Sequence, residues 1–114
     1  MKIEGPALLA RIYIGESDRW EGRPLHQAIV EKLRTSGVAG ATVLRGIEGY
    51  GRAARVHTAQ ILRLSEDLPV LIEVVDREDR LRAVLPEIDA MVDGGLITLE
   101  HVEVIAYRSP EPPE

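Results

Sequence analysis

The chain contains no cysteine and no phenylalanine, and it has a single tryptophan among 114 residues. The lack of cysteine excludes disulfides, thiol catalysis and thiolate metal sites. Because large aromatic side chains are so few, the core must be built from leucine, isoleucine, valine and alanine. No apolar run approaches the ~20 residues that a membrane span needs, and residues 1–6 lack the apolar stretch of a signal peptide. We therefore expect a cytoplasmic protein that does not insert into a membrane.

Positive charge is also scarce, since 14 lysines and arginines stand against 19 acidic residues and give a formal net charge of -5 at pH 7. An acidic chain is a poor partner for nucleic acid unless it carries a strong basic patch, so we expect no nucleic-acid partner. The length suits one domain. We predict a single domain over residues 1–114, with a core at about 7–107 and a frayed, proline-rich acidic tail at 109–114.

Hydrophobic patterning predicts four strands and two helices. Alternating or β-branched segments indicate strands at 7–14, 41–47, 69–75 and 96–107. Helical spacing predicts one helix from Leu25 to about Gly37 and another through Leu81–Val92. Residues 16–22, between the first strand and the first helix, are predicted to form a polar loop. Asp76 is expected to cap the second helix, with Asp79 completing a capping box.

The order of these elements is β-α-β-β-α-β. A chain of this order forms two layers, with both helices on one face of the sheet. We therefore predict the α+β class and a ferredoxin-like sandwich with a four-stranded antiparallel sheet.

Glycine is concentrated around the second predicted strand, which ends in the sequence Gly-Tyr-Gly-Arg at 49–52. Glycine lets a ligand or another chain approach the backbone closely, so this strand end is expected to form a contacting rim. The connection that follows, residues 52–68, is too long for a hairpin turn, and long loops in small domains are often functional. It carries Arg52, Arg55, His57 and Arg63 together with apolar residues. Both a partner-facing loop and an extended hairpin or helical turn packed on a neighbouring subunit fit this composition.

These features resemble the PII-like proteins of the nitrogen regulatory PII superfamily, in particular an uncharacterised bacterial and archaeal branch of unknown function. The resemblance spans about residues 7–107. It is carried by Lys32-Leu33-Arg34 before a glycine, by the run 42–51, by Gly49-Tyr50-Gly51-Arg52, by His57-Thr58 and by Leu68-Pro69 before a β-branched strand.

The resemblance implies a homotrimer that binds a small effector in clefts between subunits, with an adenine nucleotide as the candidate ligand. The cleft residues that it implies are Thr42, Gly49, Tyr50, Gly51, Arg52 and Arg108. The 52–68 loop would dock on a target enzyme or a membrane transporter, with Arg55 and His57 on the docking surface. PII proteins carry a phosphate-binding lysine before the last strand; here Asp93-Gly94-Gly95 occupies that place, which leaves a less charged nucleoside monophosphate open.

Two other functions fit the same fold. A metal-binding trimer similar to CutA would use His101, Glu103 or His57, because His101 and Glu103 share one face of a strand. A useful metal site needs more ligands than this, so we assign no metal. An enzyme of small-molecule breakdown is the other alternative. No acid–base pair has the spacing that catalysis needs, so we expect a protein without enzymatic activity.

Overall fold

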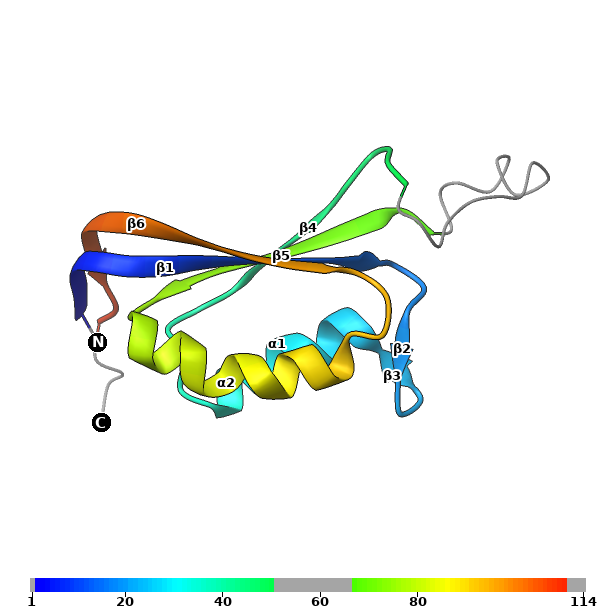
Figure 1. The fold of residues 1–114 in the computed structure, drawn as a ribbon, viewed down its shortest axis with the longest axis horizontal. Coiled ribbons are helices and arrows are strands. Elements are labelled where there is room, and N and C mark those ends of the chain that lie inside the picture. Colours follow the sequence, from blue (N-terminus) through cyan, green and yellow to red (C-terminus); the bar gives the residue numbers. More distant parts are fainter. Residues whose placement is uncertain (1, 51–66, 111–114) are drawn as a thin grey trace.

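The computed structural model describes residues 2–50 and 67–110 (Figure 1). Its helices are α1 (Leu25–Thr35) and α2 (Glu78–Met91). Its strands are β1 (Lys2–Gly15), β2 (Arg19–Trp20), β3 (Arg23–Pro24), β4 (Thr42–Arg45), β5 (Pro69–Asp76) and β6 (Leu96–Arg108). None of the helices in these two ranges is long and apolar enough to cross a membrane.

Four of the strands form one antiparallel sheet in the order β4-β5-β1-β6, and both helices lie against the same face of it (Figure 1). This is the predicted ferredoxin-like arrangement. The central strands β1 and β5 are adjacent in the sheet although far apart in sequence, and β4 and β6 form its two edges. The first strand is longer than predicted, and its pairing with β6 shifts register between Ile3 and Gly5.

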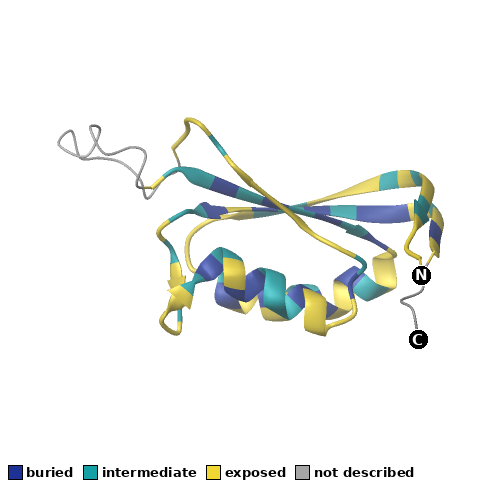
Figure 2. Cartoon of the chain, turned by 180° about the vertical axis from the view of Figure 1, so that it is seen from behind, coloured by how far each residue is buried: buried dark blue, intermediate teal, exposed yellow. Residues whose placement is uncertain are grey.

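The core lies between the sheet and the helices, as the alternating burial of β1 and β5 shows (Figure 2). From Leu8 to Ile14 of β1 and from Val70 to Asp76 of β5, every second residue points toward the helices and is buried. The helices contribute the residues that the helical spacing indicated. The central core residues are Leu8, Ile12, Ile72, Ile29, Leu33, Leu81 and Ile88, all at most 2% exposed. The core is aliphatic, as the composition predicts.

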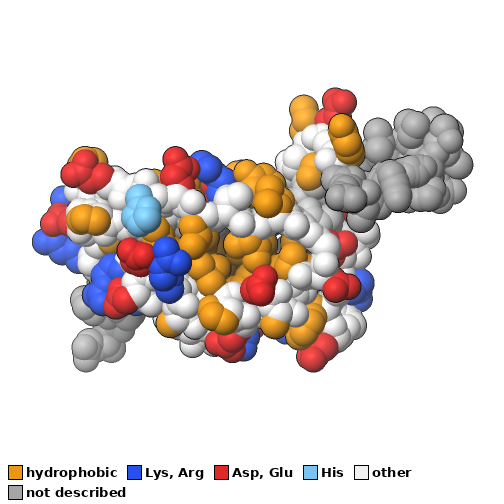
Figure 3. Space-filling view, viewed as in Figure 1, with side chains coloured by type: hydrophobic (Ala, Val, Ile, Leu, Met, Phe, Trp, Pro, Cys, Tyr) orange, Lys and Arg blue, Asp and Glu red, His pale blue; other side chains and the backbone are white. Residues whose placement is uncertain are grey.

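The helix layer packs mainly against β1 and β5, so the β6 edge is less well covered. Hydrophobic side chains are visible between the sheet and α2 in the space-filling view (Figure 3). Leu85 of α2 and Ile97 of β6 are only partly buried, and Leu99 of β6 is exposed.

Asp76 does not cap α2, which corrects the sequence-based expectation. The helix begins at Glu78 with Arg77 as its N-cap residue, and no side chain caps it. Asp76 is instead the fully buried last residue of β5, and its carboxylate accepts hydrogen bonds from the backbone N–H groups of Ala39 (2.9 Å) and Arg77 (2.7 Å). A buried carboxylate needs such partners. One of its oxygens faces the α1–β4 connection, and the other faces the start of α2, where the Arg80 guanidinium lies 3.5 Å away. Asp79 pairs with Arg77.

A small hairpin made by β2 and β3 begins inside the predicted polar loop at 16–22 and ends just beyond it, at Pro24. Its two-residue turn has positive φ at both Glu21 (47°) and Gly22 (80°). This backbone is that of a tight hairpin turn. The prediction missed it because the flanking strands are only two residues each and show no alternation.

Candidate functional site

The end of β4 forms a glycine rim against Pro69, the first residue of β5. The Gly46 N–H donates a 2.7 Å hydrogen bond to the Pro69 carbonyl. A Cβ atom at Gly46 or Gly49 would lie 2.8 or 3.0 Å from Pro69 Cγ, so side chains at these two positions would collide with the proline ring. Close backbone approach explains these glycines, and it leaves Ile47 (93% exposed) and Tyr50 (91% exposed) directed away from the domain.

Polar contacts tie the glycine rim to the β1–β2 turn. Arg45 forms an ion pair with Glu16. The Ser17 hydroxyl donates a 2.8 Å hydrogen bond to the Asp67 carboxylate, and the Glu16 N–H donates a 2.9 Å bond to the Leu68 carbonyl. The point where the chain leaves β4 and the point where it returns at Asp67 are thus held at the same end of the sheet.

Thr42 lies on the sheet face opposite the helices, where it pairs with Glu73 of β5. The neighbouring residue across the sheet is Arg11, whose guanidinium contacts Glu73 at 3.0 Å and Glu100 at 3.1 Å. The hydrogen bond to Glu73, helped by the charge of Glu100, raises the pKa of Arg11 above its ordinary value. One cation is thus shared between two carboxylates on this face.

An apolar row crosses the same face beside this charged group. Leu44 pairs with Leu71, Leu71 with Tyr13, and Tyr13 with Leu96, so the row continues over all four strands. We call these four residues the open-face row. Leu44, Tyr13 and Leu96 are 46%, 37% and 55% exposed. A continuous row of exposed apolar side chains on a sheet is a surface suited to contact with another protein chain.

Arg108 lies at the opposite end of the sheet from the glycine rim, where it pairs with Lys2. Thr42 is level with Arg11, and the stretch of β1 from Arg11 to Lys2 separates the two positions by about 30 Å at the usual strand rise. Gly49 and Tyr50 are farther still from Arg108. One chain therefore does not bring Arg108 together with Thr42, Gly49 or Tyr50.

The remaining predicted residues, namely Gly51, Arg52, Arg55 and His57, lie outside the described residues. Their assignments remain predictions.

The structure gives no support for the metal-binding alternative within residues 2–50 and 67–110. No three His, Asp or Glu side chains converge there in a way that could hold a metal ion. His101 Nε2 lies 3.8 Å from the Glu78 carboxylate on α2. The pKa of Glu78 is lowered, first by its hydrogen bond to Arg82 and to a smaller extent by His101. His101 is thus placed in a surface ion-pair group.

Sequence reasoning missed the two features that define the open sheet face. The shared Arg11 cation and the open-face row join residues that are distant in sequence and meet only through strand pairing. The only signal in the sequence was alternation in the first strand, which put Leu9, Arg11 and Tyr13 on the face away from the helices. Strand order was needed to find their neighbours.

Comparison with protein families finds one model that matches residues 7–104, described as DUF190, uncharacterized ACR, COG1993. A UPF0166 protein of Aquifex aeolicus is 39% identical over 97 residues, covering 85% of this chain and 91% of the relative. The UPF0166 protein MJ1524 of Methanocaldococcus jannaschii is 39% identical over 99 residues, covering 86% of this chain and 91% of the relative.

Among solved structures, CPII of Thiomonas intermedia K12 bound to ADP and bicarbonate has a TM-score of 0.58 at 19% identity, covering 87% of this chain and 88% of that one. CPII bound to ADP, AMP and acetate has a TM-score of 0.57 at 17% identity, covering 88% and 89%. At this identity the likeness shows the fold, and it confirms the predicted resemblance to PII-like proteins.

Proposed function

Because the chain belongs to the DUF190 family and has a PII-like fold, we propose that it is a regulatory protein that acts as a homotrimer without catalysing a reaction. In this proposal an adenine nucleotide occupies clefts between subunits in the cytoplasm. The 52–68 loop then presents Arg55 and His57 to a target enzyme or membrane transporter. Ligand occupancy would shift the loop between arrangements, and the target would bind one of them.

The open-face row is the observation that carries this proposal. Its exposed leucines and tyrosine lie on the sheet face that the helices leave uncovered, and a contact between chains would bury them. Association also offers a way to unite the predicted cleft residues, because Arg108 of one chain could approach Tyr50 of another although the two are far apart within a chain.

The solved CPII structures support the choice of ligand. Both contain ADP, and one also contains AMP. Asp93, in the place of the lysine in PII proteins, would repel a long polyphosphate, which favours nucleotides with fewer phosphates.

Replacing Leu44 with aspartate is expected to convert the trimer to monomers, because it puts a charge into a row that should be buried between chains. Light scattering coupled to size-exclusion chromatography measures the mass directly. The matched control is Ala83→Asp, which adds the same charge on the exposed side of α2 and should leave the mass unchanged. A wild-type protein that is monomeric at micromolar concentration would refute the trimer and, with it, the intersubunit cleft.

Titration calorimetry with AMP, ADP and ATP tests the ligand. We expect saturable binding that Arg52→Ala and Arg108→Ala each weaken by about tenfold or more, because each removes a charge-assisted contact to phosphate. Arg82→Ala removes an exposed arginine on α2 and serves as the control. If none of the three nucleotides produces heat with the trimer, the ligand assignment is wrong and the loop becomes the first place to search for a partner.

A further inference from the structure

A groove of about 380 Å³ lies between the outer side of α1 and the edge strand β4, away from the glycine rim and the open-face row. The groove exists because α1 packs into the core through Leu25, Ile29 and Leu33, whereas β4 is exposed along its whole length. Its lining residues are Arg23, His26, Gln27, Val30, Glu31, Arg34 and Val43. The volume is at the lower end of the range for small-molecule sites.

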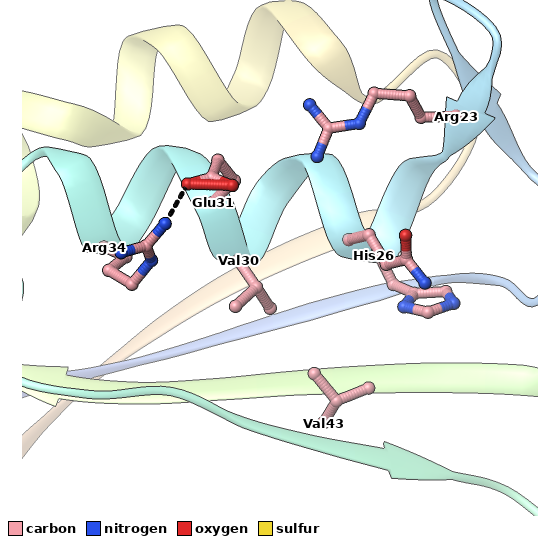
Figure 4. Close-up of a pocket in the computed structure, with 7 residues that line it drawn as sticks. Arg23, His26, Val30, Glu31, Arg34 and Val43 are labelled. Atoms are coloured by element: carbon pink, nitrogen blue, oxygen red, sulfur yellow. Dashed lines mark hydrogen bonds and ion pairs between the residues drawn. The ribbon is translucent and has the colours of Figure 1, made fainter.

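The middle of the groove is apolar. Val30 on α1 and Val43 on β4 point toward each other across the gap between helix and sheet (Figure 4). Val43 is 41% exposed although it is on the helix-facing side of its strand, because no helix covers β4 there. A ligand with an apolar part would cover these two side chains and remove them from water.

The ionisable side chains of the groove are mostly basic, in contrast to the acidic chain as a whole. At one end, Arg34 is neutralised by its ion pair with Glu31 (Figure 4). At the other end, the Arg23 side chain forms no hydrogen bond or ion pair with any other described residue, although its backbone pairs with Trp20. His26 and Gln27 lie on the adjoining first turn of α1. Uncompensated positive charge therefore remains at the Arg23 end only.

We propose that this groove binds a small organic anion, whose carboxylate or phosphate group contacts Arg23 and His26 and whose apolar body covers Val30 and Val43. A guanidinium binds either anion through charge-assisted hydrogen bonds, and an amide such as that of Gln27 adds a neutral donor. The proposal does not depend on the nucleotide cleft, because none of the groove residues belongs to the predicted cleft.

The neighbouring groove between α1 and α2 has a different character. Arg23 and Glu31 line both grooves, and the second groove adds one further cation, Lys32, but two further carboxylates, Glu21 and Glu87. Lys32 of α1 pairs with Glu87 of α2 at 3.1 Å and so links the two helices beside that groove. Carboxylates outnumber cations in that groove, and Lys32 is already paired, whereas arginines outnumber carboxylates in the α1–β4 groove, which is therefore the basic one of the two.

Amide NMR on the full-length protein, titrated with phenyl phosphate, benzoate and inorganic phosphate, tests the proposal. We expect saturable shifts at Arg23, His26, Val30 and Val43. At least one aromatic anion should bind about tenfold more tightly than inorganic phosphate, because its ring covers the valines. Whichever of phenyl phosphate and benzoate binds more tightly identifies the preferred anionic group, phosphate or carboxylate. Excess ADP should leave these shifts in place if the groove is separate from the nucleotide cleft.

Two variants separate the charged end from the apolar floor. Arg23→Ala should weaken all three probes by about tenfold, whereas Val43→Ser should weaken only the aromatic ones. Arg82→Ala removes an exposed arginine remote from the groove and is the control, so the affinity for all three probes should stay unchanged. Shifts at other residues, displacement by ADP, or an unchanged affinity in Arg23→Ala would overturn the proposal.

Discussion

Replacing Asp76 with alanine is expected to lower the free energy of unfolding by about 3 kcal/mol, because it strands several buried polar groups at once. The carboxylate is fully buried and accepts the N–H groups of Ala39 and Arg77, and Arg80 lies 3.5 Å from it. Ala39 belongs to the connection between α1 and β4. Its N–H would lose the acceptor that holds this connection to the end of β5.

Urea unfolding at a fixed protein concentration measures this loss, and Tyr107→Phe is the matched control. The Tyr107 hydroxyl donates a 3.1 Å hydrogen bond to the carbonyl of the same Ala39. Removing this hydroxyl does not take away a buried charge, in contrast to the loss of the Asp76 carboxylate. We expect that variant to lose only about 1 kcal/mol. Equal losses in the two variants would show that Asp76 acts as an ordinary hydrogen-bond acceptor and that its full burial has no special cost.

Replacing Gly95 with alanine is expected to destabilise the protein by about 2–3 kcal/mol, because the new methyl group has no space. A Cβ atom at this position would lie 2.4 Å from the Tyr13 carbonyl oxygen and 3.0 Å from Val92 Cγ1. The closest atom belongs to the backbone of β1, so a side-chain rotation cannot relieve the overlap. The start of β6 must move away from β1.

The adjacent Gly94 provides the control for this experiment. No atom lies within 4 Å of a Cβ built on Gly94, and the residue is exposed. Gly94→Ala should therefore change stability by no more than about 0.5 kcal/mol. Thermal unfolding of both variants under the same conditions compares their stabilities. A similar loss of stability in both would mean that the backbone freedom of the glycine pair matters more than the contact with Tyr13.

The fold could be predicted because it depends on short-range patterns. Alternation in β1 and helical spacing around Leu81 each arise from residues that are neighbours in sequence, and burial of the resulting faces leaves few arrangements for two helices and four strands. Asp76 was predicted wrongly for the same reason. Its local context resembles a helix cap, but the carboxylate is buried at the end of β5, and one of its oxygens accepts the backbone N–H of Ala39, which is distant in sequence.

The candidate site was only partly predictable. The glycines at 46 and 49 were noticed from sequence, but the contact with Pro69 that requires them follows from the pairing of β4 with β5. The resemblance to PII-like proteins suggested the residues of the cleft, and no local pattern says that Arg108 lies about 30 Å along the sheet from Thr42.

The sequence by itself thus determined the aliphatic core, the exclusion of thiol chemistry, the order of elements and the family resemblance, since these depend on composition and on neighbouring residues. The tertiary structure alone decided which side chains share a surface. Strand pairing assembled the open-face row from four strands and placed Arg11 between Glu73 and Glu100. The packing of α1 away from β4 left the basic groove beside Val43. Such surfaces depend on register and layer packing, which join residues that the sequence keeps far apart.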